Sequence, residues 1–168
     1  MLGPVFRAYQ PAPGRLVAVK QFRLGINPDE SQRFAASLDR IVAADLSHAG
    51  IAAPIAAGLA DTTPYLALDF VAAESFDVVM RESGPANPKE VVSFTRQLAA
   101  ALDAAAAVGV VHGDLFRDNV FWEGDAITAL IDWESASDGV LGYDVMVTVL
   151  AWCVGDALDL RLARALVT

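Results

Sequence analysis

Three oxygen-bearing side chains have the types and spacing that phosphoryl transfer requires. Asp114 and Asn119 lie five residues apart in the run HGDLFRDN, and Asp132 follows thirteen residues later in the run IDWE. Such a reaction needs a carboxylate that accepts the hydroxyl proton of the acceptor, and further oxygens that hold Mg²⁺ against the phosphates. Carboxylate and amide oxygens are the hard ligands that Mg²⁺ prefers. Asp114 is therefore the candidate base, and Asn119 and Asp132 are candidate metal ligands, with Asn119 also counted as catalytic.

A hairpin is predicted between the two metal candidates. Residues 119–122 and 126–131 read as strands around the turn Glu123-Gly124-Asp125, and a tight hairpin would bring Asn119 and Asp132 side by side at one ion. Two neighbouring residues are expected to be structural. His112 should hydrogen-bond the backbone around Asp132 and orient the loop, and Asp144 should cap backbone groups of that loop.

A lysine in an earlier strand could supply positive charge for the phosphates. Lys20 ends the run VAVK within a strand predicted over residues 16–22, although this short motif occurs by chance in many strands. A helix is predicted to follow and to end near Ser47 to Gly50, with Asn27 as its N-cap, Pro28 in its first turn and Glu30 completing a capping box. Asp39 lies on that helix, either as a partner of Lys20 or on a solvated face.

The remaining pattern predicts an α+β layout in which strands and one helix precede a mostly helical part. The other expected strands cover residues 2–9, 51–60, 65–70 and 108–112. The other expected helices cover residues 75–82, 87–107 with Asn87 as the cap, 143–153, and 157 to the C-terminus with Asp156 as the cap.

Composition excludes several classes of partner. The 168 residues carry a net charge of -9, which argues against a nucleic-acid or an anionic membrane surface as the main partner. Cys153 is the only cysteine, so no internal disulfide can form and a reducing compartment is indicated. Neither a signal peptide nor an apolar run long enough to span a membrane is recognisable, and we expect a cytoplasmic protein without a membrane partner.

These motifs, taken together, resemble the protein-kinase-like superfamily. Lys20 precedes Asp114 by 94 residues, as in a compact protein kinase, and LSHAGI resembles the family's turn after its helix in the N-terminal lobe. The resemblance implies an α+β, two-lobed protein-kinase-like fold, truncated at both ends. Residues 1–72 would form the N-lobe and residues 73–168 a partial helical C-lobe, with ATP in the cleft between them.

The resemblance also implies a nucleotide site. Lys20 would neutralise the α- and β-phosphates, positioned by Asp39, which stands where the family has a longer glutamate. Val5 and Ala18 would form an apolar roof over the adenine ring, and Phe121 would form its floor. Leu68 would be the gatekeeper, followed by the hinge backbone of Asp69 and Val71. ATP and Mg²⁺ are the implied cofactors.

The two halves of the chain resemble different branches of the superfamily. Residues up to about 112 resemble bacterial Ser/Thr protein kinases, whereas the run from His112 onward resembles small-molecule kinases of the aminoglycoside phosphotransferase and homoserine kinase type. One hypothesis is a composite chain joined near Val111 to Asp114. Three functions stay open: a small-molecule hydroxyl kinase, a Ser/Thr protein kinase, or a non-catalytic nucleotide-binding pseudokinase or fragment. A homodimer, or a partner that completes the C-lobe, is also open.

Overall fold

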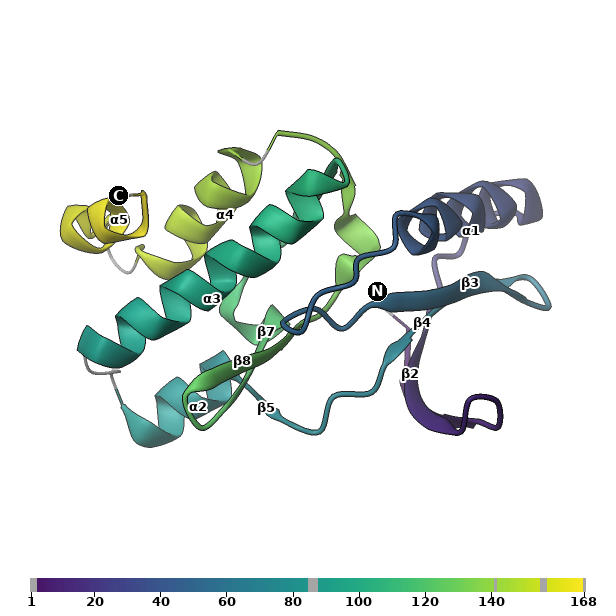
Figure 1. Ribbon diagram of the computed structural model, residues 1–168. Coiled ribbons are helices and arrows are strands. Elements are labelled where there is room, and N and C mark those ends of the chain that lie inside the picture. The colour runs from purple at the N-terminus through teal and green to yellow at the C-terminus, as the bar shows by residue number, and fades with distance from the viewer. Residues whose placement is uncertain (1–2, 85–87, 141, 155–156, 168) are drawn as a thin grey trace. The chain divides into compact units, whose positions relative to one another are not determined.

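A computed structural model describes residues 3–84, 88–140, 142–154 and 157–167 (Figure 1). The chain divides into two compact units. The first contains Met1–Ser47 and Ala52–Val71, and the second contains His48–Ile51 and Ala72–Thr168. The short stretch 48–51 belongs with the second unit because Leu130 N–H donates to the carbonyl oxygen of Gly50 at 2.7 Å and Ile51 forms a parallel bridge with Leu130.

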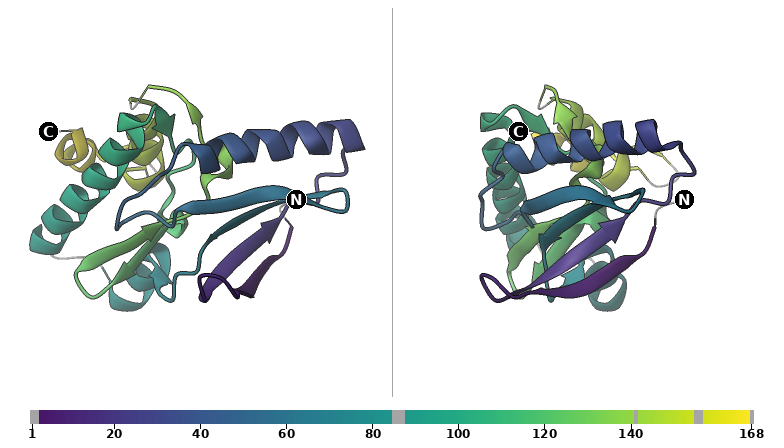
Figure 2. Two further views of the ribbon diagram at one scale, coloured as in Figure 1. Left: turned by 45° about the vertical axis from the view of Figure 1, so that its right-hand side comes forward. Right: turned by 90° about the vertical axis from the view of Figure 1, so that its right-hand side faces the viewer.

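The first unit is an antiparallel sheet with one helix on it. Its strand order is β1-β2-β4-β3, and the helix α1 runs along the sheet and packs against β3 and β4 (Figure 2). In chain order the elements are β1 (Val5–Gln10), β2 (Arg15–Gln21), α1 (Pro28–Ala43), β3 (Pro54–Ala60) and β4 (Thr63–Asp69).

The predicted start of α1 is confirmed. The Asn27 side chain accepts a hydrogen bond from the Glu30 N–H, and the Glu30 carboxylate accepts one from the Asn27 N–H, which completes the capping box. The buried face of the helix follows a spacing of three to four residues, and its members are Ser31, Ala35, Leu38 and Ile41. The helix ends at Ala43, several residues before the predicted end near Ser47.

Strand register decides which side chains share a face of this sheet. Val5 lies opposite Lys20 across β1 and β2, and Ala18 lies opposite Leu68 across β2 and β4. Directly paired residues point to the same side, and residues two apart on a strand do so as well. Val5, Ala18, Lys20 and Leu68 therefore all lie on one face.

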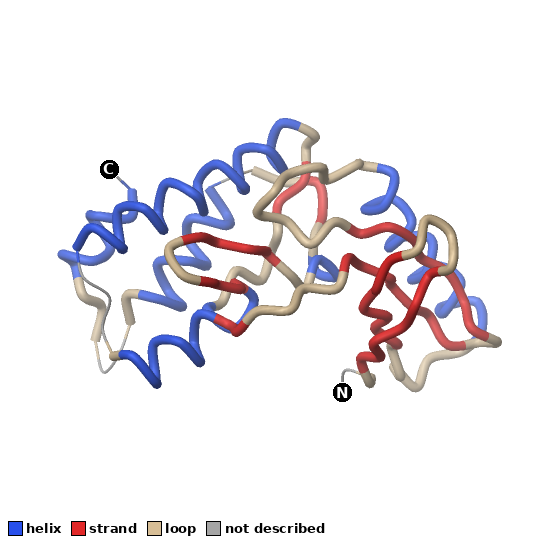
Figure 3. Tube along the Cα trace, turned by 60° about the horizontal axis from the view of Figure 1, so that its bottom comes forward, coloured by secondary structure: helices blue, strands red, loops and turns tan. Residues whose placement is uncertain are grey.

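The second unit is mainly helical and carries two small sheets, with strand orders β5-β7-β8 and β6-β9 (Figure 3). Its strands are β5 (Glu74–Ser75), β6 (Val110–Val111), β7 (Val120–Glu123), β8 (Ala126–Leu130) and β9 (Ser137–Asp138). Its helices are α2 (Phe76–Ser83), α3 (Pro88–Ala107), α4 (Gly142–Trp152) and α5 (Leu160–Val167), with short 3₁₀ turns η1 (Arg117–Asn119) and η2 (Trp133–Ser135).

An aromatic cluster and one glutamine hold this unit together. The rings of Phe76 and Phe94 contact each other and both Trp122 and Trp152, with ring centroids 4.5 to 5.9 Å apart in these pairs. Gln97 on α3 accepts from Ile127 N–H and donates to the carbonyl oxygen of Asp125, so both ends of its amide fasten the β7–β8 hairpin to the helix. Among the described residues, no helix combines the length and hydrophobicity that crossing a bilayer requires.

The predicted elements are present, with shifted ends. The last helix begins at Leu160 rather than Ala157, and Asp159 is its cap because its carboxylate accepts from the Arg161 and Leu162 N–H groups. Val154 and Leu158 form a β-bridge, so Leu158 belongs to that bridge and precedes the helix. The predicted caps Asn87 and Asp156 lie outside the described residues. The predicted strand 51–60 begins at Pro54. The strand predicted from residue 65 begins at Thr63, so β4 includes Pro64.

Candidate active site

One buried carboxylate, that of Asp144, accepts hydrogen bonds from the backbone of the loop that carries Asp114. Asp144, in the first turn of α4, is 1% exposed, and its two oxygens accept the N–H groups of His112 and Gly113, each at 2.8 Å. Both backbone donors are satisfied by a single side chain that follows them by about thirty residues in the sequence. The structural role predicted for Asp144 is confirmed.

His112 joins this loop to the segment that carries Asp132. Its Nε2 lies 2.7 Å from the carbonyl oxygen of Ile131, and its Nδ1 accepts from the Asp114 N–H at 3.3 Å. The neutral Nε2–H tautomer satisfies both contacts. The ring is fully buried and lies 4.6 Å from the Trp133 ring. The predicted orienting role of His112 is confirmed.

Burial lowers the pKa of His112 below its ordinary value, although the Ile131 hydrogen bond and the carboxylates of Asp144, Asp114 and Asp132 partly oppose this. The unfolded chain therefore binds a proton at this residue more readily than the folded protein. We expect the stability present above pH 6.5 to fall as the pH decreases from 6.5 toward the folded pKa, with a slope of up to about 1.4 kcal/mol per pH unit from this group. Urea unfolding at pH 7.5 and 5.5 would measure the decline. It should be smaller in the His112→Gln variant, and an unchanged decline would contradict the prediction.

Asn119 is brought against Asp114 as well as toward Asp132. Its amide nitrogen donates to the carbonyl oxygen of Asp114 at 2.8 Å and lies 3.3 Å from the Asp114 carboxylate. This side chain is 6% exposed, and its orientation leaves the carbonyl oxygen Oδ1 as the atom that can serve a ligand. The Ile131 N–H donates to the backbone oxygen of Asn119 at 3.0 Å. This backbone hydrogen bond joins Asn119 to the residue that directly precedes Asp132.

The backbone at Asp132 and Gly113 adopts the left-handed region. Asp132 has φ 66° and ψ 48°, a conformation that costs energy for most residues with a side chain and often marks functional positions. Gly113 has φ 82°, and a Cβ there would lie 2.7 Å from the carbonyl oxygen of Ser135. The absence of a side chain at residue 113 therefore allows the loop to pass close to the segment that follows Asp132.

The residues predicted to contact the nucleotide fall in both units. In the first, Lys20 is 5% exposed, with Nζ 5.9 Å from the Phe22 ring centre, on the sheet face described above. The Asp69 and Phe70 N–H groups donate within the sheet, to Ala53 and Leu16. Val5 is exposed, and Val71 is half-buried. Asp39 is exposed and makes no hydrogen bond or ion pair in the described part of the chain, so its pairing with Lys20 stays a prediction. In the second unit, Phe121 is half-buried on β7 and pairs with Ser75.

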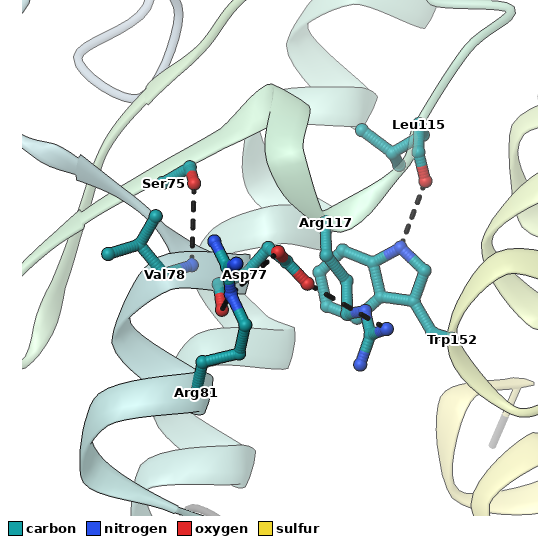
Figure 4. A network of polar contacts seen from close by, with 7 residues as sticks. All are labelled: Ser75, Asp77, Val78, Arg81, Leu115, Arg117 and Trp152. Carbon is teal, nitrogen blue, oxygen red and sulfur yellow. Dashed lines mark hydrogen bonds and ion pairs between the residues drawn. The ribbon is translucent and has the colours of Figure 1, made fainter.

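Two contacts at the loop were not predicted from the sequence. The indole nitrogen of Trp152 donates to the carbonyl oxygen of Leu115 at 2.9 Å, and the Arg117 guanidinium lies 3.9 Å from the carboxylate of Asp77 (Figure 4). Both join residues about 40 positions apart. No local pattern identifies such pairs, although Arg117 lies within the run HGDLFRDN that carries Asp114 and Asn119.

A family model described as "Phosphotransferase enzyme family", APH, matches residues 79–167, which is more than half of the chain. The protein therefore belongs to the APH phosphotransferase family, and membership in this kinase-like family implies the use of ATP. The match runs through Val111 to Asp114, so it gives no support to a junction between two different proteins at that point.

Curated relatives agree with this assignment over shorter stretches. The homoserine kinase of Rhizobium johnstonii is 42% identical over 72 residues, which are 43% of this chain and 22% of that protein. The homoserine kinase of Agrobacterium fabrum is 51% identical over 45 residues, which are 27% of this chain and 14% of that protein. The matched stretches thus span about a fifth or less of these relatives.

Solved structures match over most of the chain. The kinase domain of Mycobacterium tuberculosis PknI superposes with a TM-score of 0.71 at 24% identity, covering 89% of this chain and 65% of that one. A second structure of that domain gives a TM-score of 0.70 at 23% identity, with 97% and 78% covered. At this identity the likeness establishes the fold alone, and the α+β protein-kinase-like fold predicted from the sequence is confirmed.

Proposed function

We propose that this protein is an ATP-dependent kinase that transfers the γ-phosphate to a hydroxyl group of a small molecule of the homoserine or aminoglycoside type. The observation that carries the proposal is the orientation of Asn119. Its amide nitrogen is fixed on Asp114, and its carbonyl oxygen is left for a cation beside the segment that carries Asp132. Family membership and the named homoserine kinases support a small-molecule acceptor.

In this proposal each loop residue has one task. Asp114 accepts the proton of the attacking hydroxyl, and the Asn119 amide keeps its carboxylate in place. Asn119 Oδ1 and the Asp132 carboxylate hold Mg²⁺, a donor pair that suits a hard cation whose other ligands are water and phosphate oxygens. The ion, when bound, neutralises charge on the phosphate oxygens during transfer. His112 and Asp144 keep the loop in shape and touch no reacting atom.

The first unit would supply the nucleotide contacts. Lys20 is proposed to neutralise the α- and β-phosphates, and Val5, Ala18 and Leu68 lie on the same sheet face, where they can contact the base. The Asp69 N–H is already engaged with Ala53, so we assign its carbonyl, together with the Val71 backbone, to the adenine edge. Phe121, on β7 of the second unit, is also proposed to contact the base. Asp39 would have to change its side-chain position to reach Lys20.

The proposal predicts a nucleotide response that depends on Asp132. Saturating Mg·ATP, at about 100 times its Kd, should stabilise the wild-type protein by roughly 2.7 kcal/mol, measured as a rise in the unfolding midpoint. The Asp132→Asn variant, which keeps a residue tolerant of the left-handed backbone, should lose most of this rise because the amide is a weaker ligand.

Asp125→Asn is the matched control, because Asp125 is exposed in the turn of the same hairpin and should respond like the wild type. An equal rise in wild type and Asp132→Asn would exclude Asp132 as a metal ligand. Assays of phosphate transfer would identify the class of acceptor. ATP-dependent phosphorylation of homoserine or an aminoglycoside supports the proposal, and phosphorylation of a generic protein substrate alone would contradict it.

A further inference from the structure

Arg117 is the only Lys or Arg in the loop sequence from His112 to Asn119. It begins the turn η1, three residues after the proposed base Asp114 and two before Asn119. Figure 4 shows its side chain extending toward Asp77 in the first turn of α2. A cation is thus built into the short segment that would meet the acceptor.

This cation is loosely held. The Nη2 atom of Arg117 lies 3.9 Å from one oxygen of Asp77, beyond hydrogen-bonding distance, while the other oxygen lies 3.3 Å from Nε of Arg81. The Arg117 side chain is 44% exposed. Exposed ion pairs of this kind contribute little to stability. Asp77 therefore shares one negative charge between two arginines.

The loop does not depend on Arg117 for its shape. Asp144 holds two of its N–H groups, His112 fastens it to Ile131, Trp152 holds the Leu115 carbonyl, and Asn119 holds the Asp114 carbonyl. These contacts are short, and the side chains of Asp144, His112 and Asn119 are buried. A weak, exposed ion pair adds little to such a frame, so a role in binding explains Arg117 better than a role in folding.

We propose that Arg117 is a specificity-determining residue that binds a carboxylate of the acceptor, and that Asp77 holds its guanidinium until the acceptor arrives. This inference rests on the proposed function. Asp114 and Asp118 lie on the same loop, and Asp77 lies beside it, so an anionic acceptor meets three carboxylates there. The planar guanidinium can form two parallel hydrogen bonds with a carboxylate, which gives both charge compensation and orientation. The acceptor class is thus a hydroxy acid or hydroxy amino acid rather than a neutral or cationic alcohol.

Kinetics with two acceptors would test this. L-Homoserine carries the carboxylate, and its carboxamide has the same hydroxyl without the negative charge. Arg117→Ala should lower kcat/KM for homoserine by about 10- to 100-fold, mainly through KM, and should change kcat/KM for the carboxamide by less than about threefold. Arg96→Ala, an exposed arginine on α3, controls for the change in net charge.

The Asp77→Asn variant distinguishes a role of Arg117 in binding the acceptor from a role of the Arg117–Asp77 ion pair in shaping the loop. If Arg117 binds the acceptor, removal of its competitor should lower KM for homoserine, opposite to the effect of Arg117→Ala. If the ion pair only shapes the loop, both variants should lose activity together toward both acceptors, and the inference would be overturned. Wild-type turnover of both acceptors with no effect of Arg117→Ala would overturn the inference alone. If the wild type phosphorylated an aminoglycoside but neither homoserine nor its carboxamide, this inference alone would be overturned. If it phosphorylated none of the three, the proposed function would be overturned as well.

Discussion

Asp114→Asn is expected to lower kcat by roughly 10²- to 10⁴-fold, because the amide cannot accept the proton of the attacking hydroxyl. The variant should keep its fold and its nucleotide response. Asn119 also contacts the Asp114 backbone oxygen, which the substitution leaves in place, and the other proposed phosphate and metal ligands are untouched. Single-turnover phosphate transfer and Mg·ATP-dependent unfolding, measured on the same sample, check both parts.

Asp118→Asn is the matched control for this experiment. Asp118 lies in the same loop, has the same charge and is exposed, and no role in proton transfer or metal binding is assigned to it. Its loss should leave kcat within a few fold of the wild-type value. If both variants lost activity equally, local charge rather than proton transfer would be responsible. If Asp114→Asn kept full activity, Asp114 would not be the base.

Asp144→Ala is expected to destabilise the protein by about 2 to 6 kcal/mol. The substitution leaves the N–H groups of His112 and Gly113 without their acceptor in a buried setting, and each such group costs about 1 to 3 kcal/mol. Because whole domains are stable by only 5 to 15 kcal/mol, this loss is large. Urea unfolding at pH 7.5 measures it.

Two further variants test whether the lost hydrogen bonds cause the expected loss of stability. Asp144→Asn retains one acceptor oxygen and should be destabilised less than Asp144→Ala. Asp138→Ala removes an exposed carboxylate from β9 and should change stability by no more than about 0.5 kcal/mol. A value for Asp144→Ala similar to that of Asp138→Ala would show that the two hydrogen bonds contribute nothing net.

Local rules predicted those parts of this protein whose signals lie close together in the sequence. The capping box of Asn27 and Glu30 and the β7–β8 hairpin depend on contacts within a few residues, and both formed as expected. The resemblance of the motifs to the protein-kinase-like superfamily also predicted the fold. Asp114 and Asn119, five residues apart in one loop, are in contact. The roles of His112 and Asp144 as supports for the loop were predicted as well, since a polar residue beside such a loop usually has to satisfy its backbone.

Tertiary packing decided what no local pattern encodes. The close approach of Gly113 to Ser135 and the left-handed backbone of Asp132 depend on two loops meeting in space. The pairing of Arg117 with Asp77 likewise joins elements 40 residues apart. The amino-acid sequence determined which residues could do the chemistry, whereas contacts between segments more than thirty residues apart determined how the loop that carries them is held, because its backbone groups find their partners on α4.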